Sequence, residues 1–194
     1  MFFISKWFIR SPKRNIPKGN NIISPADGKI IRILSYNSKT KLRFRKDLLG
    51  TFDLFTKDVA EECWIICIMM NILNIHVQRA PLDAKIKQIT YRKGTFKNAV
   101  KNARNLEWME NEKNEILMQC KDFKIKVVQV AGLLTKRIKS YQKTDEIVKK
   151  GVPIGHIALG SEVVLVIPKR TNIKLNVKEG MKVIDGESII AFLN

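Results

Sequence analysis

The chain has 194 residues with ordinary apolar content, enough for one compact core, and this excludes a largely disordered protein. Its charge is unusual, because 36 Lys and Arg against 18 Asp and Glu give a formal net charge of +18. Such a charge predicts attraction to polyanions, either nucleic acid or an anionic lipid surface, although a lysine-rich proteome gives the same value without any partner.

Three scattered cysteines and two histidines argue against a disulfide framework and a zinc site. Cys63 and Cys67 lie in an apolar run and are interpreted as buried, reduced thiols. No segment reaches the roughly 18–20 apolar residues that a membrane-spanning helix needs. We therefore expect a cytoplasm-facing protein without a structural metal or a spanning helix.

Residues 1–20 form a basic, aromatic lead, broken by Pro12 and Pro17, that lacks the long apolar region of a secretion signal. Its side chains suit an anchor at a membrane interface, and equally well they could cap the core. The side chains concerned are Phe2, Phe3, Lys6, Trp7, Phe8, Arg10, Lys13 and Arg14.

The sequence Ser-Pro-Ala-Asp-Gly at 24–28 predicts a turn that leads into a strand. Pro25 fixes φ, and Asp27 followed by Gly28 favours a tight reversal of the chain. Taken alone, Asp27 is the residue that such a turn needs. Strands separated by lysine-rich turns are expected to continue to about Phe55.

Residues 63–77 form an apolar run that predicts a buried strand. At its end, His76 and Gln78 should share one face, because side chains alternate along an extended chain. A lone histidine in this place is usually a surface group or a satisfied core group. Residues 87–114 are polar and basic, and we expect a long loop with at most a short helix, of the kind that often binds a ligand.

Alternating patterns predict strands at 116–118 and 125–130, and residues 131–138 have the spacing of a short amphipathic helix. The tail at 173–193 predicts two strands bounded by glycines. The expected fold class is mainly β, a β-rich α+β fold built as a compact β-sandwich or barrel with few short helices.

The stretch 155–168 organises the rest of the chain. Val163–Ile167 is a short apolar run that follows Gly160-Ser161 and ends at Pro168, so it predicts a buried strand. In the ordinary interpretation, the turn before this strand simply needs a glycine. In the alternative, the serine hydroxyl attacks the preceding carbonyl to give an ester, and β-elimination then breaks the chain and leaves dehydroalanine, which hydrolyses to a pyruvoyl group. Such a group withdraws electrons as pyridoxal phosphate does.

Five short motifs occur in a fixed order from about residue 8 to the C-terminus. They are Ser24–Gly28, Asn74–Pro81, Asn111–Asn114, Gln129–Ile138 and Gly155–Pro168. Each is weak alone, but together they resemble the phosphatidylserine decarboxylase family, in its short archaeal-type branch. The glycine-paired tail also looks like half of a lipoyl/biotinyl-type β-sandwich, which this family is known to resemble.

The resemblance implies a proenzyme that cuts itself between Gly160 and Ser161. Residues 1–160 would form the β chain, and 161–194 the α chain, with a pyruvoyl cofactor derived from Ser161; the two chains would stay together as a heterodimer. The lead 1–20 would lie near the membrane, and 21–194 would be a single decarboxylase domain. The substrate would be archaetidylserine or phosphatidylserine, whose amine forms a Schiff base with the cofactor before CO2 leaves and the ethanolamine-headed lipid is released.

By matched position, Asp27 would assist self-cleavage and His76 would be the general acid or base, for cleavage, decarboxylation or both. Two departures from the family stand out. Arg79 replaces the second histidine of longer bacterial members, which puts an Asp-His-Ser relay in doubt, and Glu162 replaces the usual Thr or Arg after the cleavage serine. His156 matches no motif position and is expected to be structural.

The positive charge then implies peripheral attachment to the cytoplasmic face of the cell membrane, through the lead and a basic loop at 85–104. The lipid backbone and the oligomeric state, including a homo-oligomer, stay open. Two other functions were weighed. A lipoyl/biotinyl-like carrier would use Lys182, but Val183 stands where biotin acceptors have methionine, and an RNA-binding β-domain lacks the expected pattern of stacking aromatics, so no nucleic-acid partner is expected.

Overall fold

The computed structural model describes residues 10–39, 56–94, 111–132, 138–157 and 161–194, and strands dominate these residues. The strands are β1 (Asn21–Ile23), β2 (Gly28–Asn37), β3 (Glu62–Met69), β4 (Val77–Arg79), β5 (Ala84–Arg92), β6 (Lys113–Gln119), β7 (Lys124–Val130), β8 (Ile138–Ser140), β9 (Ile147–Val148), β10 (Pro153–Ile157), β11 (Glu162–Pro168), β12 (Ile173–Leu175), β13 (Lys182–Val183) and β14 (Ile189–Leu193). The predicted mainly β fold class is confirmed.

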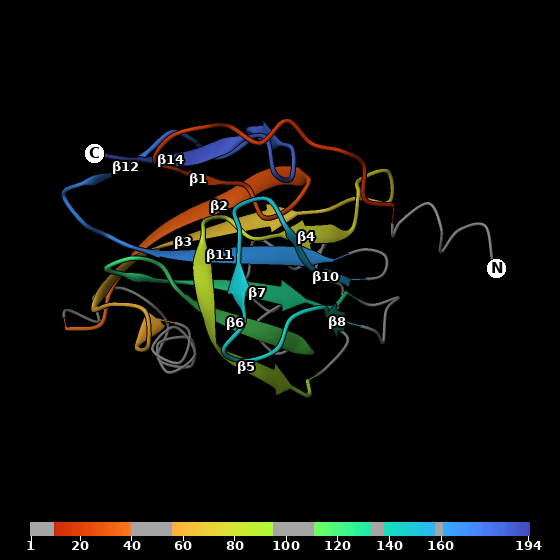
Figure 1. The fold of residues 1–194 in the computed structure, drawn as a ribbon, viewed down its shortest axis with the longest axis horizontal. Helices are drawn as coiled ribbons and strands as arrows, with labels where there is room; N and C mark the ends of the chain where they lie inside the picture. The colour runs from red at the N-terminus through yellow and green to blue at the C-terminus, as the bar shows by residue number, and fades with distance from the viewer. Residues whose placement is uncertain (1–9, 40–55, 95–110, 133–137, 158–160) are drawn as a thin grey trace.

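An eight-stranded antiparallel sheet, in the order β13-β2-β3-β11-β7-β6-β5-β9, forms the body of the molecule (Figure 1). Two three-stranded sheets, β1-β14-β12 and β4-β10-β8, lie along its upper edge and at its right in this view. β11 lies at the centre, paired with β3 on one side and with β7 on the other. Residue 161 therefore stands where a fully paired strand begins.

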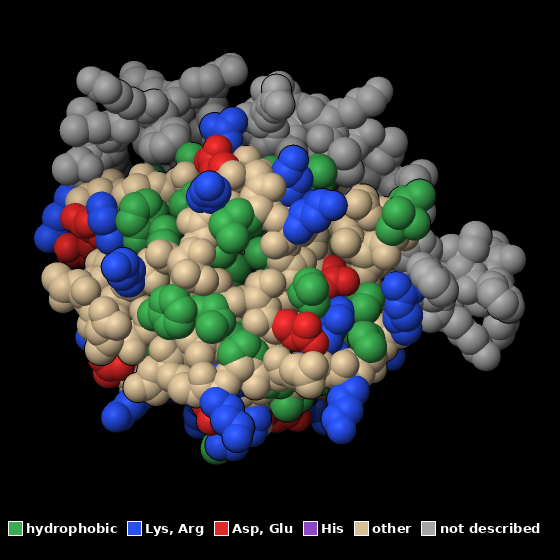
Figure 2. All heavy atoms as spheres, turned by 90° about the horizontal axis from the view of Figure 1, so that it is seen from above, with side chains coloured by type: hydrophobic (Ala, Val, Ile, Leu, Met, Phe, Trp, Pro, Cys, Tyr) green, Lys and Arg blue, Asp and Glu red, His purple; other side chains and the backbone are tan. Residues whose placement is uncertain are grey.

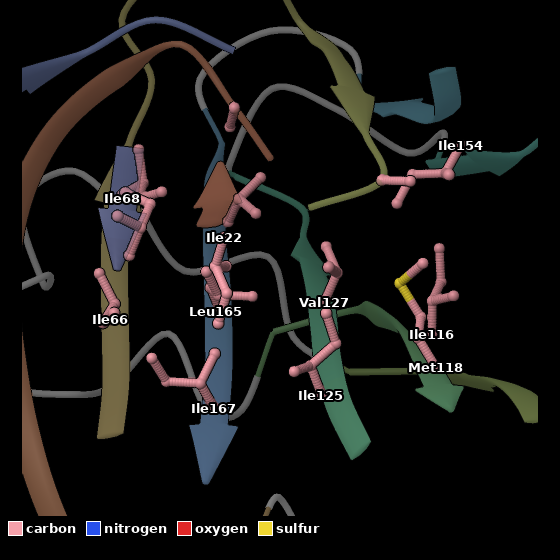
Figure 3. Close-up of a cluster of buried hydrophobic side chains, with 14 of the residues drawn as sticks. Ile22, Ile66, Ile68, Ile116, Met118, Ile125, Val127, Ile154, Leu165 and Ile167 are labelled. Atoms are coloured by element: carbon pink, nitrogen blue, oxygen red, sulfur yellow. The ribbon is translucent and has the colours of Figure 1, made fainter. Parts of the chain in front are cut away.

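One face of the large sheet carries the main core. Because side chains alternate along a strand, Ile66 and Ile68 of β3 point to the same side as Leu165 and Ile167 of β11. Figure 3 shows these side chains in line with those of β7 and β6, and with Ile154 of β10 facing them. Burial of each such side chain contributes roughly 1.5–3 kcal/mol to stability, so this layer fixes the sheet that presents residue 161.

The opposite face holds a second apolar cluster with charged groups inside it. The Nζ atom of Lys126, which is 1% exposed, lies 2.7 Å from Asp58 and 3.3 Å from Glu115. Glu162 is fully buried on this face beside Cys67, and among the described residues neither of its carboxyl oxygens has a hydrogen-bond partner of good geometry. Burial raises the pKa of Glu162 to about 8, against a smaller opposing effect of the Cys67 thiol.

The predicted strands at 116–118, 125–130 and 163–167 are confirmed as parts of β6, β7 and β11. The loop expected at 87–114 is wrong at its start, because β5 continues to Arg92 through pairing with β6, which begins at Lys113. Pairing with β6 thus determines the strand conformation up to Arg92, where the sequence pattern alone is weak.

Two other expectations need correction, and two more fall mostly on residues that the structure does not describe. The apolar run at 63–77 is two strands, because β3 ends at Met69 and a turn precedes β4. The tail forms three short strands, β12, β13 and β14, in place of the predicted two. Most of the helix expected at 131–138 and the strands expected beyond residue 39 lie outside the described residues, and Ile138 itself begins β8.

Lys and Arg side chains outnumber Asp and Glu on the face that carries β1, β12 and β14 (Figure 2). Hydrophobic side chains lie between them, singly or in small groups. Within the described ranges, no helix has the length and apolar character needed to cross a bilayer.

Gly28 is required where the 24–28 turn enters β2. Its φ is +152°, and a Cβ atom there would lie 2.3 Å from the Met69 carbonyl oxygen. We expect Gly28→Ala to lower the free energy of unfolding by about 2–4 kcal/mol, through strain and overpacking. Gly180 has a φ of +89° and no atom within 4 Å of such a Cβ, so Gly180→Ala should cost only about 1–2 kcal/mol. Equal losses in urea unfolding would contradict the steric argument.

The buried Glu162 should make stability depend on pH. Its folded pKa of about 8 lies above the ordinary 4.5, so the folded state keeps a proton that the unfolded state loses as pH rises. The stabilisation that the protonated Glu162 contributes is fully present below about pH 4.5 and is lost as the pH rises from there to about 8. Relative to Glu162→Gln, the parent chain should lose on the order of 3 kcal/mol between pH 5 and pH 8 in urea unfolding. Both proteins also carry Ser161→Ala, which removes the serine of the predicted cleavage site.

A matched control uses Glu61, whose side chain is 66% exposed. Glu61→Gln should leave the pH dependence of stability as it is in the parent. A parent protein whose stability is flat from pH 5 to pH 8 would show that Glu162 is ionised in the fold.

Candidate active site

Ser161 lies immediately before β11 and is fully buried. Its carbonyl oxygen accepts a hydrogen bond from the backbone N–H of Met70 at 3.0 Å, which continues the pairing of β11 with β3. Within the described ranges its hydroxyl has no hydrogen-bond partner. An unpaired buried hydroxyl is costly, so a group of this kind calls for an explanation, and a chemical role supplies one. The other predicted residue of the cleavage site, Gly160, lies outside the described residues.

A chain of hydrogen-bonded amides runs from β6 to β4 beside this serine. Asn114 Nδ2 donates to Gln129 Oε1 at 2.9 Å, and Gln129 Nε2 donates to Gln78 Oε1 at 2.7 Å. Gln78 Nε2 in turn donates to the His76 carbonyl at 2.8 Å and lies 3.7 Å from the sulfur of Met70. Met70 therefore links the two sides of the site, because its N–H bonds the Ser161 carbonyl and its sulfur lies near Gln78, and the amide chain adds no charge there.

Gly155 makes room for this network. A Cβ atom at Gly155 would lie 2.8 Å from Gln129 Nε2 and 2.6 Å from the Lys139 carbonyl oxygen. A side chain here would displace the glutamine or spread β10 from β8, so the glycine in the 155–168 motif has a structural reason.

His76 is fully buried at the start of β4, and its backbone carbonyl also accepts a hydrogen bond from Ile157 N–H at 3.1 Å. The imidazole Nδ1 lies 2.9 Å from the Asn74 carbonyl oxygen. A carbonyl can only accept, so Nδ1 carries the hydrogen, and in the neutral ring Nε2 holds the lone pair. Burial lowers the pKa of His76, partly offset by the Asn74 bond, and the charge of Arg10 lowers it further. The ring is therefore suited to accept a proton near neutral pH.

Asp27 holds the backbone in front of His76. Its Oδ2 accepts the Ile75 N–H at 3.1 Å, and its Oδ1 accepts Arg14 Nη2 at 3.1 Å and Asp185 N–H at 2.9 Å. The structure thus brings Asp27 to the histidine segment through a backbone amide and gives no direct bond from this carboxylate to the imidazole. This geometry favours a positioning role for Asp27.

Two arginines and two aspartates form a buried ion cluster around this point. Arg79 Nε donates to Asp185 Oδ2 at 2.6 Å, and Arg14 bonds both Asp185 and Asp27. Arg79 also binds the Gly151 carbonyl at 2.9 Å. Burial and the neighbouring Asp27 raise the pKa of Asp185, while both arginines oppose the rise. Arg79 stands where longer bacterial members have a second histidine. Its bonds to Asp185 and to the Gly151 carbonyl hold the guanidinium in place.

The ion cluster was missed by the sequence reasoning, which treated Arg14 as a surface cation of the lead. The side chain of Arg14 is only 13% exposed and its charge is used internally. The aromatic residues of the lead, from Phe2 to Phe8, lie outside the described residues. A signal for the cluster was present, because Asp185-Gly186 repeats the Asp27-Gly28 pattern on a second turn.

His156 lies apart from this network. It is half-buried on β10, and its Nδ1 is 2.8 Å from the Tyr141 hydroxyl. Its strand neighbours are Val77 and Lys139, whereas Gln78 pairs with Gly155. Alternation therefore turns His156 to the opposite face of β10 from the amide network.

Other chemistry-bearing groups do not converge here. In the described part of the chain, no three His, Cys, Asp or Glu side chains are grouped to hold a metal. Cys63, Cys67 and Cys120 are buried, and burial raises the pKa of each thiol. A surface hollow of about 390 Å³ lies near Asp83, Phe123 and Lys150, and none of the predicted site residues lines it.

Comparison with known proteins agrees with these observations. Residues 2–191 match the family model for phosphatidylserine decarboxylase. The phosphatidylserine decarboxylase proenzyme of Syntrophus aciditrophicus (strain SB) is 36% identical over 94% of this chain and 76% of its own. Two proteins named "Putative archaetidylserine decarboxylase proenzyme" are each 34% identical over 98% of this chain. The one from Methanosarcina barkeri is covered over 78% of its length and the one from Methanocaldococcus jannaschii over 90%. The resemblance inferred from the five motifs is confirmed, and the chain belongs to the phosphatidylserine decarboxylase family, a family of carboxy-lyases.

Proposed function

We propose that this chain is a proenzyme that cuts itself between Gly160 and Ser161 and then removes CO2 from a serine-headed phospholipid. The observation that carries the proposal is the buried Ser161 hydroxyl, which lacks a hydrogen-bond partner among the described residues and stands at the start of a doubly paired strand. The word proenzyme in the relatives' names supports processing of the chain.

The cleavage steps follow from the residues at the site. The Ser161 oxygen attacks the Gly160 carbonyl carbon, the C–N bond breaks as the acyl group moves to oxygen, and a base accepts the hydroxyl proton. Loss of the Cα proton then breaks the Cβ–O bond and leaves a carboxylate on Gly160. The dehydroalanine at 161 takes up water and loses ammonia to become a pyruvoyl group. His76 is proposed as the base, since its neutral ring presents Nε2. Gln78, which bonds the His76 carbonyl, also lies 3.7 Å from the sulfur of Met70, whose N–H bonds the Ser161 carbonyl.

The fold would hold the two products together. Residues 161–194 contribute four strands. Of these, β11 pairs with β3 and β7, β13 with β2 and β14 with β1, while β12 pairs with β14. The smaller chain is therefore tied into two sheets, and the new terminus at 161 stays beside Met70. This supports a heterodimer of the cleaved chains.

The pyruvoyl group would supply the ketone that captures the substrate amine and withdraws electrons as CO2 leaves. The described residues fit such a group, because a small buried position flanked by neutral amides can hold a ketone without a competing charge. His76 would return a proton to the carbon that loses CO2. Relatives are named for phosphatidylserine and for archaetidylserine, so the proposal covers either lipid backbone. The net charge of +18 supports peripheral attachment to the cytoplasmic face of the cell membrane.

Intact mass under denaturing conditions tests the cleavage. The parent protein should give two chains, 1–160 and 161–194, with the smaller one lighter by one ammonia than a serine-terminated chain. Ser161→Ala should remain a single chain, while the control Ser140→Ala, on β8, should cleave like the parent. A parent protein that stays uncut after long incubation would contradict the proposal.

The pH dependence of cleavage tests His76. Because burial lowers its pKa below the ordinary 6.5, the neutral base persists to lower pH than in a free histidine. The cleavage rate should be flat above pH 6.5 and fall only below it. His76→Gln should slow cleavage about 10²–10⁴-fold, and His156→Gln should leave it near the parent rate. Quenched samples analysed by mass would report the rates, and an acid limb at or above 6.5 would rule out this histidine as the base.

A further inference from the structure

The turn between β3 and β4 carries an exposed apolar pair. Ile72 is 60% exposed and Leu73 is 73% exposed, and they are consecutive at the tip of the turn. Single exposed apolar side chains are ordinary, but two adjacent ones on a projecting turn form a local hydrophobic contact surface.

The turn is held rigidly by its own polar groups. Asn71 N–H donates to Asn74 Oδ1 at 2.8 Å, Leu73 N–H donates to Asn71 Oδ1 at 2.8 Å, and Asn74 N–H donates to the Asn71 carbonyl at 3.1 Å. These bonds fix the backbone without burying either apolar side chain. The hydrogen bonds of the turn therefore hold the backbone in a form that leaves Ile72 and Leu73 exposed.

The same turn is joined directly to the candidate active site. The Asn74 carbonyl accepts the His76 Nδ1 hydrogen at 2.9 Å, and the next amide, Ile75 N–H, donates to Asp27 at 3.1 Å. The tip, the imidazole and the ion cluster therefore form one hydrogen-bonded unit. A surface that engages the tip also lies next to the histidine.

A cation of the N-terminal segment lies near this corner of the molecule. Arg10 is close enough to lower the pKa of His76, and Lys13 on the same segment is exposed. In Figure 1 the turn that precedes β4 lies on the side where the N-terminal segment begins. Across the small sheet, Lys139 and Val77 are the two strand partners of His156, which contacts the partly exposed Tyr141.

We propose that the turn at 71–74 docks on an anionic lipid bilayer by inserting Ile72 and Leu73 at the boundary of head groups and acyl chains. Exposed apolar side chains near a basic segment, on a protein of net charge +18, have the composition of an interfacial contact. A second copy of this chain fits less well, since two molecules of charge +18 would bring like charges together. The inference rests on the proposed function for its substrate, because docking here would let a serine-headed lipid reach residue 161 while its acyl chains stay in the bilayer.

The test uses the full-length, purified protein and sedimentation with vesicles of phosphatidylcholine and phosphatidylglycerol in equal parts. Ile72→Ser together with Leu73→Ser should weaken vesicle binding about tenfold or more, because two exposed large apolar side chains are lost. The matched control is Ile147→Ser, since Ile147 is 78% exposed on β9 at the far edge of the large sheet. This control should bind vesicles like the parent.

Activity separates docking from damage to the site. The double variant should cleave at residue 161 at the parent rate and should decarboxylate a short-chain, monomeric phosphatidylserine with unchanged kcat/KM. Its rate on phosphatidylserine within the same vesicles should fall about tenfold, in line with the loss of binding. Leu73→Trp should give a blue-shifted emission difference spectrum with vesicles.

The outcomes are distinct. Parent-like vesicle binding by the double variant, or an equal loss in Ile147→Ser, would overturn the inference while leaving the proposed function intact. A changed oligomeric state with unchanged vesicle binding would assign the turn to a contact between copies and would also overturn it. If neither protein cleaves or releases CO2 but the double variant alone loses vesicle binding, the proposed function fails and the docking surface stands.

Discussion

The pairing of β11 along both of its edges is the constraint on which the rest of the site depends. Backbone bonds to β3 and β7 leave residue 161 no freedom to move along the strand direction. Because side chains alternate, the same strand buries a serine hydroxyl on one face and the carboxyl of Glu162 on the other. Two polar groups that lack good partners among the described residues therefore stand at adjacent positions, and the hydrophobic layers on either side offset their cost.

A second constraint is electrostatic. Asp27 and Asp185 lie against Arg14 and Arg79, so two negative charges meet two positive ones in a nearly dry environment. Breaking one member of such a cluster leaves another charge unpaired, which makes the cluster all-or-none. The cluster joins the N-terminal segment, the 24–28 turn and the C-terminal turn at the point where the histidine segment begins. The N-terminal part of the chain, β4 and the C-terminal turn are thereby set in one place.

Sequence patterns were sufficient for the strands that carry strong periodicity and for the order of the motifs. The strand at 163–167 and the turn at 24–28 can be predicted from the sequence, because their residue types have strong local structural preferences. The extension of β5 to Arg92 could not be foreseen, since that strand owes its existence to pairing with β6 and β9. The bond from Asp185 N–H to Asp27 spans 158 positions, and the matching Asp-Gly turns hint at two similar turns without showing that they meet.

Residues 161–194 pass through two of the three sheets, and this would affect refolding after the proposed cut. In the uncut chain, β11 to β14 are tethered to their partners, so closing those contacts is an intramolecular search with a modest entropic cost. Once the chain is cut, the same contacts require two separate molecules to meet, and recovery of the fold depends on concentration. After denaturation, the two cut chains could not re-form the peptide bond that once joined them. The chain would therefore have to fold before it is cut. The cut form would then last only as long as it unfolds slowly, which is kinetic stability.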